Sequence, residues 1–236
     1  MRDHIALALD VESIEEAAEL ARKVSESVGV LKIGLELFTR HGPAAIDRLQ
    51  ARDQKIFLDL KLHDIPETVE RSVRGIASLG VDMLTVHAAG GTEMLKRARA
   101  AAPSSMTLLA VTVLTSLDSN DVRAIGFERS PKDQALHLAR LALDAGIRGL
   151  VTSPEEVAAM RQLSKDAVLV TPGVRPAGAA SGDQKRTRTP KEAIASGADL
   201  IVVGRPIRDA SDPAAAALDI AWEVAAGLEA RAPRPS

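Results

Sequence analysis

Eight short aliphatic runs recur along the whole chain, and they restrict the possible folds more than any other feature of the sequence. Each run is continuously apolar instead of alternating between apolar and polar residues, which is the pattern of parallel strands buried on both faces. We therefore predict strands at Ile5–Leu9, Val30–Ile33, Ile56–Leu60, Met83–Val86, Thr107–Val113, Gly149–Val151, Val168–Val170 and Leu200–Val203.

Helix signatures separate these runs. Ser13-Ile14-Glu15-Glu16 has the residue pattern of a capping box, and it opens an Ala/Leu/Val-rich segment that ends near Gly29. Proline stands in the first turn of several further helices, where its missing N–H costs nothing. The further predicted helices cover Pro66–Leu79, Gly91–Ala101, Pro131–Ala145, Pro154–Leu163, Pro190–Ser196 and Pro213–Glu229.

Eight strands alternating with helices within 236 residues predict an α/β protein with a (β/α)₈ TIM barrel, in which a helix follows each parallel strand. A doubly wound open sheet is the alternative that the pattern leaves open. No linker-like stretch divides the chain, so we expect one catalytic barrel domain over residues 1–229 and a disordered tail over 230–236. The long irregular segment Pro172–Thr189 is of a length that is usually functional in a compact domain.

Composition excludes several classes of protein. The formal net charge is only -2, so the excess of basic residues that nucleic-acid and membrane-surface proteins usually carry is absent. The chain has no cysteine, which excludes disulfides, thiolate metal sites and cysteine nucleophiles. No apolar run approaches the roughly 20 residues that cross a bilayer, and the N-terminus lacks the pattern of a signal peptide. We expect a globular, cytoplasmic protein with no nucleic-acid or membrane partner.

The third predicted strand carries the strongest functional signal. Asp59, Lys61 and Asp64 stand within six residues at the end of a buried strand, where a barrel places its catalytic groups. Residues i and i+2 of a strand share a face, so Asp59 and Lys61 should point the same way, with Phe57 beneath them. Such charges are costly at a buried position unless they pair or act in function. A purely structural ion pair between Asp59 and Lys61 remains an alternative.

Two further charges belong to the first and second predicted strands. Lys32 lies inside an apolar strand, and a buried lysine needs a carboxylate partner unless its strand is exposed at an edge. Asp10 ends the first strand, where it either joins this group of charges or caps the following helix. A Mg²⁺ site on the aspartates of the third strand is opposed by the neighbouring lysines, so we expect no metal.

A second group of candidate residues follows the last two strands. Gly204 and Arg205 end the eighth strand, and Arg175 follows the seventh. The loops after these strands habitually bind phosphate in this fold, with close backbone approach at glycine and bidentate donors from arginine. Gln184 could reach the same place from the long irregular segment. These residues predict a site for a phosphate monoester.

Hydroxyl and imidazole side chains give weaker signals. Thr115 and Ser116 follow the fifth strand, where they either bind the polar edge of a heterocycle or form a turn. His63 and His87 stand near the same end of the barrel. Most histidines in such positions form local hydrogen bonds, and that role is the simpler expectation for both.

The segment Asp59–Thr68, with the sequence DLKLHDIPET, resembles the D-x-K-x-x-D signature of orotidine 5′-phosphate decarboxylases. The resemblance extends in the same order over essentially the whole chain. Its other segments are Leu7–Asp10, Lys32–Gly34, Leu114–Ser116, Thr171–Arg175, Asp183–Arg186 and Val203–Ile207.

The resemblance implies a reaction and its catalytic residues. The reaction is the decarboxylation of orotidine 5′-monophosphate to uridine 5′-monophosphate, the last step of de novo UMP synthesis, with no metal or cofactor. Lys61 would donate a proton to C6 of the pyrimidine, and Asp59 would lie beside the departing carboxylate. Lys32 and Asp10 would bind ribose hydroxyls and orient these charges.

The resemblance also implies binding residues and a partner. Thr115 would contact the base, and the phosphate ligands would be Arg175, Gln184, Gly204 and Arg205. Asp64, Ile65 and Thr68 would be contributed to the site of the neighbouring subunit in a homodimer. The nearest rivals are Mg²⁺-dependent sugar-phosphate decarboxylases or aldolases, which carry an acidic ligand where this chain has Lys32. A catalytically silent barrel that only binds ligands is the other alternative.

Overall fold

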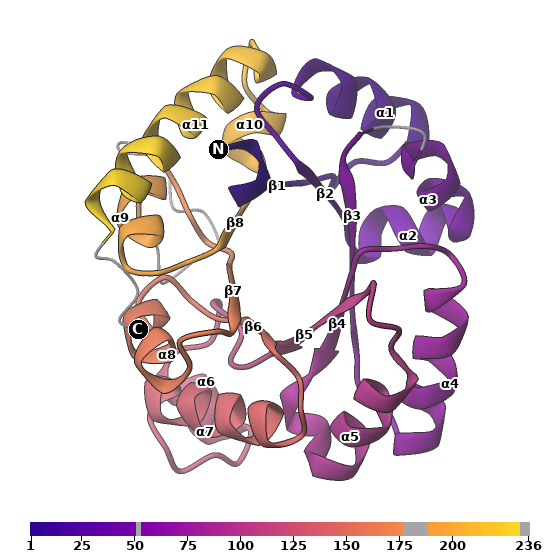
Figure 1. The fold of residues 1–236 in the computed structure, drawn as a ribbon, viewed down its shortest axis with the longest axis vertical. Helices are drawn as coiled ribbons and strands as arrows, with labels where there is room; N and C mark the ends of the chain where they lie inside the picture. The colour runs from indigo at the N-terminus through magenta and orange to yellow at the C-terminus, as the bar shows by residue number, and fades with distance from the viewer. Residues whose placement is uncertain (51–52, 177–187, 232–236) are drawn as a thin grey trace.

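The computed structural model describes residues 1–50, 53–176 and 188–231. Eight parallel strands form a closed barrel in which each strand pairs with the next and β8 pairs with β1 (Figure 1). The strands are β1 (Ile5–Ala8), β2 (Val30–Ile33), β3 (Lys55–Leu62), β4 (Met83–His87), β5 (Thr107–Val111), β6 (Gly149–Val151), β7 (Val168–Thr171) and β8 (Leu200–Val203). The predicted (β/α)₈ barrel is confirmed, and the open sheet is wrong because the β1–β8 pairing closes the edge.

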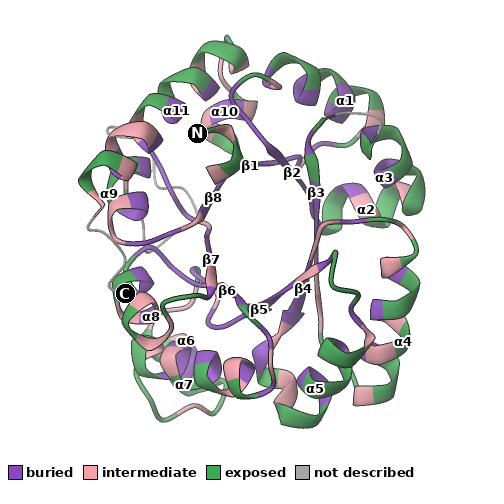
Figure 2. Cartoon of the chain, viewed as in Figure 1, coloured by how far each residue is buried: buried purple, intermediate pink, exposed green. Residues whose placement is uncertain are grey.

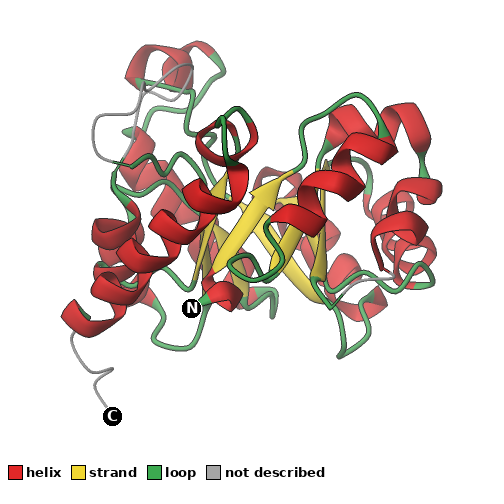
Figure 3. Cartoon of the chain, turned by 90° about the horizontal axis from the view of Figure 1, so that it is seen from above, coloured by secondary structure: helices red, strands yellow, loops and turns green. Residues whose placement is uncertain are grey.

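Helices surround the strands of the barrel (Figure 3). The outward faces of the helices are largely exposed, while most strand residues are buried (Figure 2). The helices are α1 (Ile14–Lys23), α2 (Leu35–His41), α3 (Pro43–Gln50), α4 (Pro66–Ala77), α5 (Gly91–Ala101), α6 (Ser119–Ala124), α7 (Pro131–Asp144), α8 (Val157–Leu163), α9 (Pro190–Ala195), α10 (Arg205–Arg208) and α11 (Pro213–Ala230), with short 3₁₀ turns at Arg2–His4 and Ala88–Gly90. Within the described ranges, no helix combines the length and the apolarity that crossing a bilayer requires.

Local signals located the starts of several helices better than their ends. The hydroxyl of Ser13 accepts the N–H of Glu16 at 3.1 Å, so α1 begins where its sequence predicts. The helix ends at Lys23 instead of continuing toward Gly29. At that point the Ser25 hydroxyl donates to the carbonyl of Arg22 at 3.1 Å, which offers the backbone an alternative to helical hydrogen bonds.

Other predicted boundaries also shift. Helix α8 begins at Val157, three residues after the predicted start, because the Glu156 carboxylate accepts the N–H of Ser153 at 3.2 Å and forms a turn there. Strand β5 ends at Val111, two residues earlier than predicted. No local pattern indicated α2, α3, α6 or α10, which are all short.

The barrel encloses a small aliphatic core of its own, separate from the larger core between strands and helices. Inward-facing side chains of the strands fill it: Ala6, Ala8, Val30, Phe57, Leu109, Val170, Leu200 and Val202. Phe57 is the only aromatic side chain in this cluster and is 2% exposed. The inside of the barrel is therefore filled with packed side chains below its C-terminal end.

An ionic network joins the last helix to the N-terminal ends of the strands. The carboxylate of Asp199, directly before β8, accepts the N–H of Leu169 at 2.9 Å. The same carboxylate accepts a hydrogen bond from Arg161 at 2.6 Å and another from Arg231 at 3.2 Å. Both guanidinium groups are largely buried, so Asp199 satisfies donors that water does not reach freely.

This network corrects the predicted start of the tail. We expected the helix to end at Glu229 and a disordered tail to begin at residue 230. The structure includes Ala230 in α11, and Arg231 donates to the carbonyl of Gly197 at 2.8 Å as well as to Asp199. The ordered chain extends further because Arg231 finds these acceptors beside β8, and residues 232–236 lie outside the described residues.

We predict that Asp199→Ala lowers the free energy of unfolding by about 2 kcal/mol, since it removes the acceptor of a backbone N–H and the carboxylate that pairs with two largely buried guanidinium groups. Urea unfolding followed by circular dichroism measures the change. Glu19→Ala is the matched control, because it removes an exposed carboxylate that pairs with Arg22 on the surface of α1. Equal losses for the two variants would contradict a structural role for the Asp199 network.

Candidate active site

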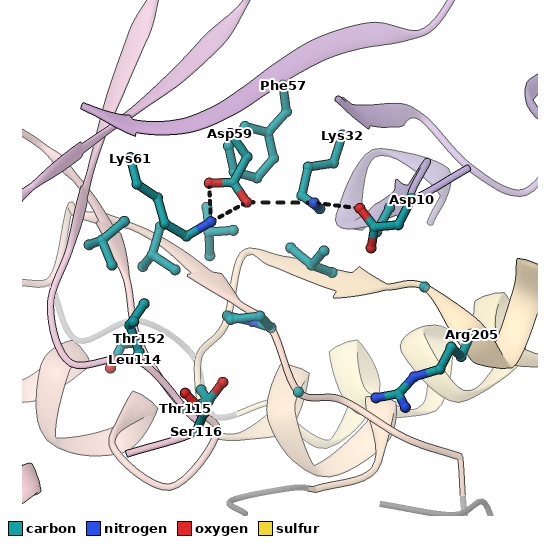
Figure 4. A pocket seen from close by; sticks show the side chains of 18 of the residues that line it. Asp10, Lys32, Phe57, Asp59, Lys61, Leu114, Thr115, Ser116, Thr152 and Arg205 are labelled. Carbon is teal, nitrogen blue, oxygen red and sulfur yellow. Dashed lines mark hydrogen bonds and ion pairs between the residues drawn. The ribbon is translucent and has the colours of Figure 1, made fainter. Parts of the chain in front are cut away.

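A cavity of about 450 Å³ opens at the C-terminal ends of the strands (Figure 4). Seven of the eight strands end at or beside it, as expected for the active-site end of such a barrel. Its polar lining residues are Asp10, Lys32, Asp59, Lys61, Thr115, Ser116, Thr152, Arg175, Arg205 and Arg208.

Four charged side chains of alternating sign form a line along one wall of this cavity. The ammonium group of Lys32 lies 3.3 Å from Asp10 and 3.5 Å from Asp59. Lys61 continues the line, with its Nζ atom 2.9 Å from both carboxylate oxygens of Asp59 (Figure 4). Lys32 was expected to have a carboxylate partner, and it has two, Asp10 and Asp59. The alternative of an exposed edge strand is wrong, because the Lys32 side chain is only 11% exposed.

The backbone at Lys61 departs from a regular strand. Its φ is 50°, in the left-handed region that residues other than glycine seldom adopt, and the β3–β4 register shifts between Leu58 and Leu62. The hydroxyl of Thr85 on β4 accepts the N–H of Lys61 at 2.9 Å and donates to Asp59 at 3.0 Å. Asp59 and Lys61 do meet, but through an irregular segment instead of the simple alternation that we predicted. Backbone strain held in this way is typical of functional sites.

The charge line determines the ionisation of Asp59. Burial by itself would raise the pKa of this carboxyl group, because it removes the charged form from water. The positive charges of Lys32 and Lys61, together with hydrogen bonds from Lys61 and Thr85, outweigh burial and lower the pKa below its ordinary value. Asp59 is therefore an anion at neutral pH despite being buried.

The other predicted residues of the third strand lie apart from this line. Asp64, Ile65 and Thr68 are exposed, and none of them lines the cavity of its own chain. Asp64 accepts the N–H of Ile65 at 2.7 Å, a local contact at the start of α4. The side chain of Ile65 is one of the most exposed large apolar groups among the described residues, at 66%.

The opposite side of the cavity carries the residues predicted to bind base and phosphate. Thr115 is buried and faces the cavity beside Ser116 (Figure 4). Arg175 is also buried, and it donates to the carbonyl of Val174 at 2.8 Å. Gly204 and Arg205 line the part of the cavity next to β8. Gln184, which we also predicted here, lies outside the described residues.

The two histidines near the mouth stack on each other and do not line the cavity. The ring centroids of His63 and His87 are 5.3 Å apart, with 29° between the planes. The pKa of His87 is lowered, first by burial and then by the nearby charges of His63 and Lys61. The neutral form of His87 is favoured. The rings stack, whereas we expected local hydrogen bonds, and within the described residues the buried Nδ1 atom of His87 has no hydrogen-bond partner.

Sequence reasoning missed three residues of the site. Thr85 binds both partners of the central ion pair, and Thr152 lines the cavity at the end of β6. Arg208 lines the cavity from α10 and donates to the backbone carbonyl of Asp10 at 2.8 Å. The only available signal was for Arg208, which stands three residues after Arg205 in a segment that the structure shows to be helical.

We predict that Lys32→Met raises the pKa of Asp59, because one of the two cations that favour the carboxylate is removed while burial remains. Carbon-13 NMR of the carboxyl carbon as a function of pH measures this pKa. In the native protein, the stability due to ionised Asp59 should be lost as the pH falls through its lowered pKa. Lys23→Met on the surface of α1 is the control, and an Asp59 titration that is identical in both variants would refute the electrostatic coupling.

Comparison with known proteins gives a consistent result. Residues 3–220 match the model of the orotidine 5′-phosphate decarboxylase / HUMPS family. The chain is 54% identical over 220 residues to the orotidine 5′-phosphate decarboxylase of Anaeromyxobacter sp. (strain K), covering 93% of this chain and 97% of the relative. It is 51% identical over 222 residues to the enzyme of that name from Thermobifida fusca (strain YX), covering 93% and 95%.

A solved structure agrees with these sequence relatives. The crystal structure of orotidine 5′-phosphate decarboxylase from Lactobacillus acidophilus superposes with a TM-score of 0.81 at 38% sequence identity, covering 93% of this chain and 98% of that one. The family match extends over most of the chain, and the barrel and the charged cavity fit it. The chain therefore belongs to the orotidine 5′-phosphate decarboxylase / HUMPS family.

Proposed function

We propose that this protein decarboxylates orotidine 5′-monophosphate to uridine 5′-monophosphate, the last step of de novo UMP synthesis. The observation that carries the proposal is the line of alternating charges from Asp10 to Lys61 along one wall of the cavity, with Arg205 at another wall. Relatives named for this activity are about half identical over more than nine-tenths of both chains, which supports the same reaction.

The reaction requires stabilisation of a localised carbanion. Loss of CO₂ breaks the bond between C6 and the carboxyl carbon and leaves the electron pair on C6, in an orbital that the ring cannot delocalise. An ammonium group held beside C6 stabilises this charge and then transfers a proton to it. Lys61 fits this role, because its Nζ is held by both oxygens of Asp59 and its side chain is still 32% exposed. Solvent can then return a proton to the neutral amine.

Asp59 and Lys32 prepare the site for this step. Asp59 remains ionised and would lie beside the substrate carboxylate, where repulsion favours its departure as CO₂. Lys32 holds Asp59 from the other side and also contacts Asp10, so the whole line is arranged before substrate binds. Such preorganisation avoids the cost of reorienting dipoles in the transition state. We propose that Asp10 and Lys32 bind the ribose hydroxyls.

The remaining lining residues suit a nucleotide. A volume of about 450 Å³ lies within the range of small-molecule sites, roughly 300–1,000 Å³. Arg175 and Arg205 supply guanidinium groups, and Gly204 offers a backbone without a side chain, for the phosphate; Gln184 is proposed as a further ligand. Thr115, with Ser116 beside it, offers hydroxyl groups to the base. Binding energy from the phosphate can organise the reacting end of the site.

Lys32 favours this reaction over the Mg²⁺-dependent sugar-phosphate reactions of similar proteins. A divalent cation needs carboxylate oxygens that face a common point. Here the ammonium group of Lys32 occupies the space between Asp10 and Asp59, within 3.5 Å of an oxygen of each. Both carboxylates are thus already neutralised by a resident cation, and we propose that the reaction uses no metal and no organic cofactor.

The exposed residues after β3 support a shared site in a homodimer. Asp64, Ile65 and Thr68 match the part of the family signature that follows the catalytic lysine, yet they are exposed and do not line the cavity of their own chain. An isoleucine side chain that is 66% exposed gains free energy when a partner covers it. We propose that these residues complete the site of a second copy of the chain.

The experiment that tests the function follows the loss of orotidine 5′-monophosphate absorbance with purified protein, with and without excess EDTA. We expect equal turnover in both conditions. Turnover that EDTA abolishes would contradict the metal-free mechanism, and absence of any turnover would contradict the proposed reaction.

We predict that Lys61→Ala lowers kcat by about 1,000-fold or more, because it removes both the charge that stabilises the carbanion and the proton donor. The same absorbance assay measures turnover, and calorimetric titration with UMP tests whether the site still forms. Lys23→Ala on α1 is the matched control and should leave turnover unchanged. Substantial residual turnover in a Lys61→Ala protein that still binds UMP would exclude its assigned role.

We predict that mixing inactive Lys61→Ala and Asp64→Ala subunits restores part of the activity. In such a heterodimer one of the two sites receives an intact Lys61 from one chain and an intact Asp64 from the other. Differently tagged subunits that are refolded together and purified by both tags provide the sample. No recovery in verified heterodimers would argue against shared sites.

A further inference from the structure

Arg208 lines the cavity, and three of its five hydrogen-bond donors are engaged by the protein. Its Nε and Nη2 atoms donate to the two carboxylate oxygens of Asp209, at 2.6 Å and 3.0 Å. Its Nη1 atom donates to the backbone carbonyl of Asp10 at 2.8 Å. A guanidinium group has five N–H donors in a fixed fork, so a bidentate contact on one side fixes the direction of the donors on the other.

The carbonyl of Asp10 lies where the sheet no longer provides a partner on the β8 side. The β1–β8 pairing extends to Leu7 and Val203, after which the chain turns at Gly204 and enters α10. On the other side, β2 still holds β1 through the N–H of Leu9, which donates to the carbonyl of Lys32 at 3.0 Å. Arg208, which belongs to helix α10, therefore donates a hydrogen bond to the Asp10 carbonyl beyond the last β1–β8 pair.

The position of the Asp10 carboxylate depends on this part of the backbone. Its side chain forms the 3.3 Å ion pair with Lys32 and is 41% exposed. A partly exposed aspartate on the free end of a strand keeps its direction only if its backbone is held. Arg208 holds that backbone, and it does so from the same short helix that begins with Arg205.

We propose that Arg208 is a positioning residue: it fixes Asp10 relative to Lys32 and to the Gly204–Arg205 segment, and it is not itself a phosphate ligand. The proposal rests on the proposed function, in which Asp10 binds the ribose and Arg205 the phosphate. It assigns different tasks to two arginines that stand one helical turn apart at the same cavity. Arg205 is exposed and lines the cavity, and Arg208 links the proposed phosphate side of the site to the proposed ribose side.

The test compares Arg208→Met, Asp10→Ala and the double variant in kcat/KM for orotidine 5′-monophosphate and in Kd for UMP. We expect Arg208→Met to lower kcat/KM by about 10- to 100-fold, the size of effect that slight misplacement of a site residue produces. If Arg208 acts through Asp10, the double variant loses no more than Asp10→Ala alone. Losses that multiply would show that Arg208 acts independently of Asp10 and would overturn the proposal.

Arg208→Lys separates positioning from simple charge. Lysine keeps the positive charge at the cavity but lacks the fork that spans Asp209 and the Asp10 carbonyl. We expect a loss close to that of Arg208→Met. Full activity in Arg208→Lys would identify long-range attraction of the anionic substrate as the role of Arg208, against the proposal.

Controls keep the result interpretable. Arg22→Met breaks a comparable bidentate arginine contact on the surface of α1 and should retain wild-type kinetics. Thermal unfolding checks that each variant is folded. If Arg208→Met does not fold, Asp209→Asn provides a second test, because it loosens the same guanidinium group. We expect it to cause a smaller loss of kcat/KM that is again non-additive with Asp10→Ala, and an additive loss would overturn the proposal.

The wild-type protein separates this inference from the proposed function. A wild-type protein that neither turns over substrate nor binds UMP would contradict the proposed function itself. An active wild type with an equally active Arg208→Met would contradict this inference alone.

Discussion

The pairing of one buried carboxylate with two ammonium groups underlies the whole site. Asp59 lies in the mouth of the barrel, where burial opposes its charge, and it remains ionised because Lys32 and Lys61 lie on either side of it. Each lysine would in turn be costly at this depth without that carboxylate. Removing Asp59 would take from Lys61 the carboxylate that holds it and would leave Lys32 with Asp10 alone. The pairing of these charges therefore holds the ammonium group of Lys61, which can donate a proton, next to the carboxylate of Asp59 at the mouth of the barrel.

The fold accommodates this arrangement through a local irregularity. At Lys61 the backbone adopts a positive φ and the register with β4 shifts, which a regular strand would not allow. Thr85 makes this conformation possible, because its single hydroxyl accepts the Lys61 N–H and donates to Asp59. Below this segment, packed apolar side chains fill the interior of the barrel, and Phe57 is the largest of them. This packing gives the strained segment a rigid support. The strain is confined to the mouth, where the chemistry takes place.

Closure of the barrel brings the two functional walls together. The charged wall is built from β1, β2 and β3, and the phosphate wall from β7 and β8, which are the far ends of the sequence. They become neighbours because β8 pairs with β1. The contact of Arg208 with the carbonyl of Asp10 spans this seam, across 198 residues of sequence. Ribose and phosphate groups of one substrate can thus be bound by opposite ends of the chain.

The sequence by itself determined an α/β fold of parallel strands, because continuously apolar strands must be buried on both faces and helical segments alternate with them. It favoured the barrel, but only the tertiary pairing of β8 with β1 excluded an open sheet. It also determined that Lys32 needs a carboxylate and that Asp59 and Lys61 belong together, since unpaired charges in apolar strands are too costly. Only the tertiary structure decided which partners meet. Thr85 reaches Asp59 from a neighbouring strand 26 residues away, and Arg208 reaches Asp10 across the closed barrel. No local pattern encodes these contacts, because they arise from strand register and barrel closure, which depend on the whole chain.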